Sequence, residues 1–508
     1  MKYKPLLVTL LLLGNVLTSY GATGANSAVD MNTINIMPVL PYPASSDIHY
    51  EECFDLTRII IDCEELSSAT AWTEKYMKEW YGEFAPSVVA GKSVSGISDA
   101  EAYSLLSDGS GVSVKARTLQ GIRYAMFTLR QLVIPKRGTK TIAGYIIRKA
   151  DIEDRPVSDF RGLHICWFPE VQAWEVERLI RLAAFFKMNY VVLEPWGTFR
   201  SDVAPWYGYP DGTMTKSEVK RLCGIAKDLG VTLIPQLNVF GHAALARERV
   251  GKHAALDTHP EYQPLFEPDN GWNFCLTNPE TRTLIMDLIK ELYDAFERPP
   301  FFHIGCDEAY DPSCPDCLKR PYSEILSEHI TAVSETIVKM GARPMMWHDK
   351  LLVKGDQRWK GFTATGSQET AKLANTLPKD IVICDWCYKT PKEDYPTLKY
   401  FKGLGFDVLT CPFKDVKGME TQIKFSQKNG IGVLGTLWHH YFGDDLFNIY
   451  YHLSCMMWYG DMKDIPYRSW LSAFYTMLRY VCWDMKFTDY TRFGSFKYQV
   501  PPENFLNN

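Results

Sequence analysis

The sequence predicts an α/β protein in which a small α/β domain precedes a (β/α)8 barrel of the TIM type. From Asp151 onward, short runs of apolar and β-branched residues alternate with longer amphipathic stretches, and the alternation repeats eight times. Strands followed by helices pair in parallel through right-handed crossovers, and eight such units close into a barrel. An open doubly wound sheet is the alternative, but no Gly-rich phosphate turn follows a strand, which favours the barrel.

The N-terminal residues have the pattern of a secretory signal peptide. Lys2 and Lys4 precede an apolar run from Leu6 to Leu17, and small residues follow, with plausible cleavage after Gly21 or Ala25. The apolar run is too short to span a bilayer, so a membrane anchor is the weaker interpretation. We therefore expect residues 1–25 to be removed on export to the periplasm or the extracellular medium.

Residues 30–150 are expected to form the small α/β domain. Strand patterns occur at Arg58–Ile61 and Gly111–Lys115, and Leu119–Leu132 has a helical apolar face. The segment from Glu101 to Val133 predicts a strand, a glycine turn, a second strand and a helix. This arrangement is typical of a compact α/β unit.

The barrel is expected over residues 151–460, and residues 461–508 are expected to add a helix and a tail. Its strands are predicted near Arg161–Ile165, Tyr190–Leu193, Thr232–Pro235, Phe301–Ile304, Pro344–Trp347, Ile381–Cys384, Phe406–Leu409 and Gly432–Leu437. The predicted helices include Glu175–Lys187, Lys216–Asp228, Tyr322–Met340, Ala371–Leu377 and Leu446–Tyr459.

Composition and charge give no reason to expect a nucleic acid or an anionic membrane as partner. The 508 residues carry a formal net charge of -5, with 46% hydrophobic and 13% aromatic residues. The 13 cysteines are scattered, but two CxxC pairs occur, Cys314–Cys317 and Cys384–Cys387. A four-cysteine zinc site made by both pairs and a local disulfide within the first pair are both open interpretations.

Two adjacent acids follow the predicted fourth barrel strand. Asp307 and Glu308 come directly after the apolar run Phe301–Ile304. Acids at this position are also typical of a helix N-terminus, but functional groups of such barrels gather where strands end. Glycoside cleavage needs a proton donor at the leaving oxygen and negative charge near the developing cation. Adjacent carboxyls suit a mechanism in which an acetamide of the substrate attacks.

The motif HIGCDEAY, which contains Asp307 and Glu308, resembles the HxGxDE signature of glycoside hydrolase family 20, the β-N-acetylhexosaminidases. The chain looks closest to the hexosaminidase D-like branch. The segment from Glu101 to Val133 is similar to the end of the small domain that precedes many family 20 barrels. SDFRGLHICWFP and VTLIPQLNVFGHA resemble the first-strand and third-strand motifs, with Arg161 and His242 in the family's site positions.

The resemblance implies a retaining, substrate-assisted hydrolase that releases terminal N-acetylhexosamine from glycans and needs no cofactor or metal. Glu308 would be the general acid and base, and Asp307 would orient the acetamide. Arg161 would grip the sugar hydroxyls, beside His242. The apolar walls around the sugar would come from Trp347, Trp386 and Trp438 at the ends of strands five, six and eight.

Several positions depart from the family pattern. Glu194 stands where many members have a His-Trp-His stretch, and it either contacts the sugar or has a structural role. Gln236 and Asn238 replace the usual Glu and Asp, and His439–His440 replace the acid expected after Trp438. No tyrosine follows strand seven.

Three other functions remain open from the sequence. A metal-dependent hydrolase on the same fold would use groups near the strand ends, namely His164, His242, His303, His348 and Asp349. A non-catalytic aminosugar-binding protein would keep the pocket without turnover. A glycosidase acting on plain hexosides would not need an acetamide.

Overall fold

The structure is a computed structural model of the whole chain, and it describes residues 39–139, 142–169, 171–209, 212–244, 255–268, 271–388, 393–438 and 448–462. The expected signal peptide and nearly all of the expected C-terminal extension lie outside these residues. Among the helices within the described ranges, none combines the length and apolar character needed to span a bilayer.

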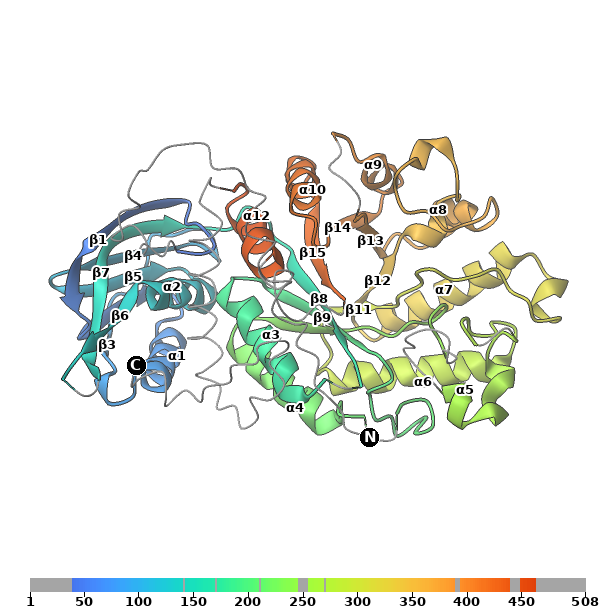
Figure 1. Cartoon of the computed structure of the whole chain (residues 1–508), viewed down its shortest axis with the longest axis horizontal. Helices are drawn as coiled ribbons and strands as arrows, with labels where there is room; N and C mark the ends of the chain where they lie inside the picture. The colour runs from blue at the N-terminus through green and yellow to red at the C-terminus, as the bar shows by residue number, and fades with distance from the viewer. Residues whose placement is uncertain are drawn as a thin grey trace, which may run out of the picture. The chain divides into compact units, whose positions relative to one another are not determined.

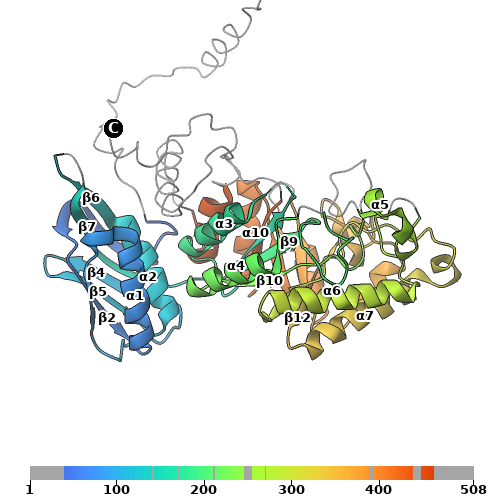
Figure 2. The same cartoon turned by 90° about the horizontal axis from the view of Figure 1, so that it is seen from below.

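The first part of the chain forms a mixed sheet of seven strands in the order β1-β7-β4-β5-β2-β3, with β6 paired to β7. Helices α1 and α2 lie side by side on one face of this sheet (Figures 1 and 2). The strands are β1 Ser45–Asp55, β2 Arg58–Cys63, β3 Ser87–Ala90, β4 Tyr103–Asp108, β5 Gly111–Ala116, β6 Val133–Arg137 and β7 Ile142–Asp154. The helices are α1 Leu66–Tyr81 and α2 Leu119–Leu132.

The local chemistry of residues 103–132 explains why this segment was predictable. Strands β4 and β5 pair in antiparallel register around a tight turn, in which the Asp108 carboxylate accepts hydrogen bonds from Ser110. Thr118 caps α2 by accepting the N–H groups of Gln120 and Gly121. The expected strand, turn, strand and helix are therefore confirmed, whereas β1, β7 and α1 were not predicted.

The second part forms a nearly closed barrel of eight parallel strands, which confirms the predicted fold class. The order is β10-β9-β8-β15-β14-β13-β12-β11. Between β10 and β11 the ring is completed by an isolated bridge from Gln236 to His303. The strands are β8 Arg161–Trp167, β9 Tyr190–Pro195, β10 Thr232–Pro235, β11 Phe301–His303, β12 Arg343–Trp347, β13 Val382–Trp386, β14 Asp407–Cys411 and β15 Gly432–Leu437.

A helix follows each barrel strand among the described residues, and α6 and α7 run side by side (Figure 1). These helices are α3 Ala173–Phe185, α4 Lys216–Asp228, α6 Pro279–Ala295, α7 Tyr322–Lys339, α8 Leu373–Thr376, α9 Pro396–Gly403, α10 Val416–Lys428 and α12 Ser454–Trp458, with a short α5 at Ala255–Thr258. The helix expected at Leu446–Tyr459 is different in detail. A π-helical turn at Asn448–Leu453 precedes the short α12, and residues 446 and 447 lie outside the described residues.

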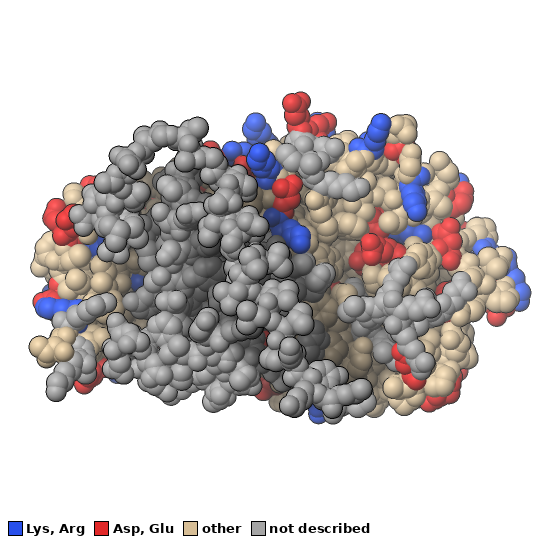
Figure 3. Space-filling model, in the orientation of Figure 1, with Lys and Arg blue, Asp and Glu red and all other residues tan. Residues whose placement is uncertain are grey.

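The barrel interior is filled by apolar side chains that alternate along the strands. Its central cluster consists of Val192, Ile234, Met345, Trp347, Val382, Cys384, Leu409, Cys411 and Leu434. At the N-terminal ends of the strands, Phe160 stacks on Tyr190 with ring centroids 4.3 Å apart. The polar side chains of the barrel interior lie at the opposite end of the barrel, where the strands have their C-terminal ends. On the surface in Figure 3, basic and acidic side chains of the described residues are interspersed.

A buried polar cluster connects the end of the first sheet with the barrel. Lys187, which follows α3, is completely buried, and its Nζ lies 2.7 Å from Asp154 Oδ2 and 2.8 Å from Tyr103 Oη. The indole N–H of Trp458 donates to Asp154 Oδ1 over 2.8 Å. Residues far apart in the chain therefore neutralise one another's charge and complete one another's hydrogen bonds in a site that excludes water.

Candidate active site

The two adjacent acids lie in a strained turn directly after β11. Gly305, Cys306 and Glu308 all have positive φ, at 66°, 77° and 47°. Such angles are uncommon for residues other than glycine and are concentrated at functional sites. At Gly305 a Cβ would lie 1.7 Å from Asn238 Oδ1, so the motif needs a glycine there. The turn therefore packs against the segment that follows β10.

The carboxyl groups of Asp307 and Glu308 point into different surroundings and share one histidine. The side chain of Asp307 is only 7% exposed, whereas that of Glu308 is 53% exposed. His242 Nε2 lies 3.4 Å from Asp307 Oδ2 and 3.6 Å from Glu308 Oε2. The His242 ring packs on Trp272 with centroids 4.3 Å apart. The structure thus brings together the two acids and the histidine that were expected at the site.

The backbone of Glu308 is held on both sides. Its N–H donates to Asp349 Oδ2 over 3.0 Å, and its carbonyl accepts the Trp272 indole N–H over 2.9 Å. Asp349 also accepts hydrogen bonds from Thr365 and from the Trp386 indole. Burial, and then the charge of Asp307, raise the pKa of Asp349 above its ordinary value. These contacts fix the backbone of Glu308 and therefore the direction in which its side chain points.

Glu194 belongs to a buried hydrogen-bonded row rather than to an exposed pocket surface. It is 1% exposed, and its carboxylate lies 2.9 Å from His164 Nε2. The Asn238 amide donates to Glu194 Oε1 over 2.7 Å, and Gln236 donates to Asn238 Oδ1. Of the two roles left open for Glu194, these contacts support the structural one. Because Asn238 abuts Gly305, the row supports the turn that presents the acids.

The three tryptophans expected as sugar walls are not equivalent. Trp386 and Trp438 are partly buried and pack on the central cluster, and the Trp438 indole donates to Tyr388 Oη over 2.8 Å. Trp347 is completely buried, with its ring against His303 and Trp438. Trp347 has no exposed surface in this structure, and the sugar contact expected of it stays a prediction.

The expected role of Arg161 is contradicted. Arg161 is the first residue of β8, at the opposite end of the strand from the rim that holds the acids, and it is 1% exposed. Its guanidinium donates to both carboxylate oxygens of Glu101, to Tyr124 Oη and to the carbonyls of Lys187 and Ser158. All of its donor groups are hydrogen-bonded within the protein, so none is available to bind sugar hydroxyls.

The histidines of the metal-dependent alternative do not converge on one group within the described residues. His164 pairs with Glu194, whereas His348 lies 3.3 Å from Asp385 and 3.1 Å from the Thr363 carbonyl. Of that set only His242 lies with the two acids. His439 and His440 lie outside the described residues.

Three residues of the site were missed or given another role. Asp349 was considered only as a metal ligand, although a polar residue two positions past a buried strand is a usable signal. Tyr388 follows β13 and bonds to Trp438, so a tyrosine is present near the site but after strand six. Trp272 lies in an irregular segment, where no periodicity could have shown that it contacts Glu308.

Two family models match the chain. The model described as glycosyl hydrolase family 20, catalytic domain, matches residues 172–445, and the model described as glycosyl hydrolase family 20, domain 2, matches residues 37–155. The first match alone spans more than half of the 508 residues. This chain belongs to glycoside hydrolase family 20. The family resemblance of HIGCDEAY is thereby confirmed, whereas membership of the hexosaminidase D-like branch stays a prediction.

Relatives within family 20 are similar at a low level of identity. A β-hexosaminidase of Porphyromonas gingivalis is 25% identical over 382 residues, which are 65% of this chain and 46% of the relative. A β-hexosaminidase of Vibrio furnissii is 25% identical over 62% of this chain and 52% of its own length. The chain thus spans about half the length of these curated relatives.

Solved family 20 structures share the fold. The exo-β-N-acetylglucosaminidase of Vibrio harveyi has a TM-score of 0.64 at 18% identity, over 88% of this chain and 77% of that one. The β-N-acetylhexosaminidase of Bacteroides fragilis has the same TM-score and identity, over 88% and 96% of the two chains. At this identity the similarity concerns the fold alone.

Proposed function

We propose that this family 20 chain is a β-N-acetylhexosaminidase, which releases terminal β-linked N-acetylhexosamine from glycans. The single observation that supports this function best is the unequal pair of acids after β11. Asp307 is buried and Glu308 is largely exposed, and both contact His242. Membership of the family and the names of the relatives are consistent with it.

The two carboxyl groups have the surroundings that a substrate-assisted reaction requires. Protonated Glu308, exposed at the rim, donates its proton to the departing glycosidic oxygen while the acetamide oxygen attacks the anomeric carbon. Asp307 accepts the acetamide N–H and stabilises the positive charge that develops on the resulting ring. The Glu308 carboxylate then takes a proton from water, which opens that ring with net retention.

The partly buried Trp386 and Trp438 are proposed as the apolar surfaces that contact the sugar and its N-acetyl methyl group. Both rings are held by hydrogen bonds, Trp386 to Asp349 and Trp438 to Tyr388. Rings fixed in this way lose little further freedom when a sugar binds.

A panel of aryl glycosides tests the proposed function. The purified protein should cleave the β-N-acetylglucosaminide, the β-N-acetylgalactosaminide or both, and should act far more slowly on the matching hexosides without the acetamide. On substrates whose leaving group needs a proton, Glu308→Gln should lower kcat by roughly 100- to 10,000-fold, the range of general acid–base catalysis. Turnover of plain hexosides at equal rates, or an unchanged Glu308→Gln variant, would contradict the proposal. Binding of aminosugars without turnover would support the non-catalytic alternative.

We also propose that the protein is exported, on the pattern formed by Lys2, Lys4 and the apolar run up to Leu17. Expression of the full chain, followed by N-terminal sequencing of the mature form, tests this. A new N-terminus after Gly21 or Ala25 in the exported fraction is expected. Retention of Met1 in the cytoplasm would contradict it.

A further inference from the structure

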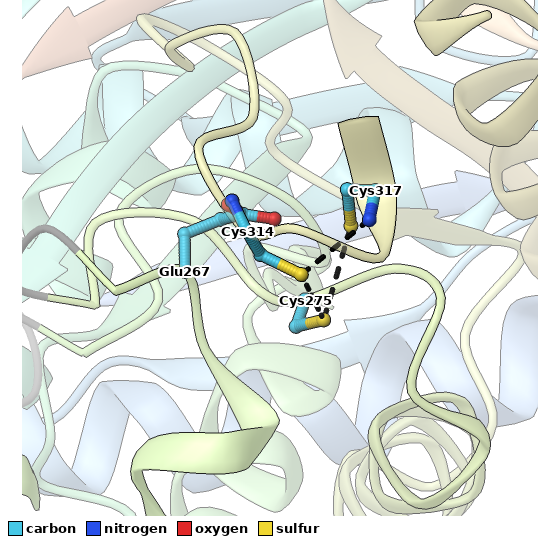
Figure 4. Close-up of side chains that lie close together, drawn as sticks. All are labelled: Glu267, Cys275, Cys314 and Cys317. Carbon is cyan, nitrogen blue, oxygen red and sulfur yellow. Dashed lines mark hydrogen bonds between the residues drawn. The ribbon is translucent and has the colours of Figure 1, made fainter. Parts of the chain in front are cut away.

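Three thiols and one carboxyl group lie close together, as Figure 4 shows. One of the segments that carry them also contacts the backbone of Glu308 through Trp272. Glu267 and Cys275 belong to the segment between β10 and α6, and Cys314 and Cys317 belong to the segment between β11 and α7. All four are buried, with exposed fractions between 1% for Cys317 and 8% for Cys314. The proposed catalysis does not use any of them.

The distances in this cluster match a tetrahedral metal centre. Cys275 Sγ lies 3.6 Å from Cys314 Sγ and 3.8 Å from Cys317 Sγ. Sulfurs bound to one zinc ion at about 2.3 Å in tetrahedral geometry are separated by about 3.8 Å. The four potential ligand atoms all lie within 4.8 Å of one another. A disulfide needs sulfurs about 2.05 Å apart, so the thiols are not placed for one.

We propose that Glu267, Cys275, Cys314 and Cys317 bind a zinc ion. Three thiolates and one carboxylate complete four-coordination with protein ligands alone, which is typical of a structural zinc rather than a catalytic one. Thiolate-rich tetrahedral sites select zinc over harder cations such as Mg²⁺ and Ca²⁺. The ligand set differs from both sequence interpretations of the CxxC pairs. Cys384 and Cys387 do not belong to it, and Cys275 was not singled out.

Polar groups next to the sulfurs orient them within the cluster. The backbone N–H of Cys317 points to Cys314 Sγ over 3.4 Å, and Thr277 Oγ1 lies 3.2 Å from Cys317 Sγ. Such outer contacts orient metal ligands and help to set their affinity.

Glu267 is held in place before any metal arrives. One of its oxygens, Oε2, accepts the backbone N–H groups of Ser313 and Cys314, each over 2.7 Å. The same carboxylate thus fixes the segment that carries two of the thiols. A ligand that is already oriented loses less freedom on binding, which favours the metal-bound state.

The metal would join the segment that contacts the backbone of Glu308 to the segment that follows Glu308 in the chain. Trp272 and Asn273 lie between Glu267 and Cys275 in the sequence. Trp272 donates to the Glu308 carbonyl, and Asn273 exchanges hydrogen bonds with the backbone of Tyr310. The acids themselves form a separate group with His242. The zinc would therefore support the site without contacting the reacting atoms.

Metal content tests this inference independently of glycosidase activity. The full-length protein, purified under reducing conditions with Zn²⁺ and then freed of loose metal, should contain about one zinc per chain. Cys275→Ser and Cys317→Ser should each lose most of it. Cys223→Ser, which changes a buried cysteine of α4, is the matched control and should retain it. Zinc-free wild type, or equal zinc in the ligand variants and the control, would overturn the inference.

A second measurement uses the wild-type chain and therefore tests the inference even if the ligand variants fail to fold. Co²⁺ loaded in place of zinc should give the visible bands of a tetrahedral site and the charge-transfer bands of thiolate ligation. Zinc should also protect Cys275, Cys314 and Cys317 from alkylation, as mapped by mass spectrometry. Absence of the cobalt bands, or a disulfide among these three cysteines in the metal-loaded protein, would overturn it.

Discussion

Asp307 and Glu308 are consecutive in the chain, but the positive φ at Cys306 and Glu308 turns their side chains into different surroundings. One carboxyl is buried beside His242, and the other reaches the surface. Burial makes proton exchange with water difficult and makes nearby charges stronger, so the buried group suits a fixed electrostatic role. The exposed group can release and recover a proton, as a general acid must.

The different surroundings of Asp307 and Glu308 predict how the activity of the Glu308→Gln variant depends on the leaving group of the substrate. A glutamine cannot donate the proton, so substrates with poor leaving groups should lose activity by roughly 1,000-fold or more, within the upper range for acid catalysis. Aryl glycosides whose leaving group needs no proton should be affected much less in the first, ring-forming step. Single-turnover kinetics with a nitrophenyl and an alkyl glycoside make the comparison. Equal losses on both substrates would argue against Glu308 as the proton donor.

Among the secondary-structure elements, α7 has a direct connection to the site. His329 of α7 is 1% exposed, and its Nε2–H donates to the carbonyl of Val239 over 2.8 Å. Val239 lies three residues before His242. Burial lowers the pKa of His329 to about 4, because the apolar surroundings disfavour the charged ring.

The lowered pKa of His329 predicts a pH dependence of stability. Between pH 6.5 and 4 the unfolded chain binds a proton at this histidine and the folded chain does not, so stability falls as the pH falls. The loss should reach about 3 kcal/mol at the acid end of this window. His329→Gln should flatten the curve of unfolding free energy against pH. The same substitution at His259, whose side chain is 39% exposed, is the control and should leave the slope unchanged.

At the scale of the whole molecule, the buried pair Lys187–Asp154 joins the first sheet to the barrel. Burial lowers the pKa of Lys187, and the charge of Asp154 partly offsets this. A buried pair adds little net stability over apolar residues, but removing one partner leaves the other charge unpaired. The connection is therefore sensitive to single substitutions.

Lys187→Met is expected to destabilise the protein by about 3–5 kcal/mol, the range for breaking a buried ion pair from one side. The double variant Lys187→Met, Asp154→Asn should recover part of this loss, because no buried charge is left unpaired. Denaturant unfolding of the two variants and the wild type measures both effects. If the double variant is less stable than the single variant by the full cost of Asp154→Asn alone, the two residues are not coupled.

The barrel and the position of the acids were predictable from the repeated strand–helix pattern and the motif HIGCDEAY. Both signals are local, because the spacing of apolar residues and the identity of turn residues are read from neighbouring positions in the sequence. The role of Arg161 was predicted wrongly because its partners lie far from it in the sequence, Tyr124 in α2 and Glu101 just before β4, and leave no local signal. The burial of Trp347 and the contact of Trp272 with Glu308 likewise depend on distant segments. The cysteine cluster was missed for the same reason, because Cys275 lies 39 residues from Cys314.

The central claim, that the substrate's own acetamide is the nucleophile, is tested most directly by a series of aryl β-N-acylglucosaminides. Replacing the N-acetyl group with its mono-, di- and trifluoro derivatives progressively weakens the amide oxygen as a nucleophile and changes the size of the group only slightly. If this oxygen attacks the anomeric carbon, kcat/KM of the wild-type protein should fall steeply with each fluorine. A flat profile across the series would contradict the account.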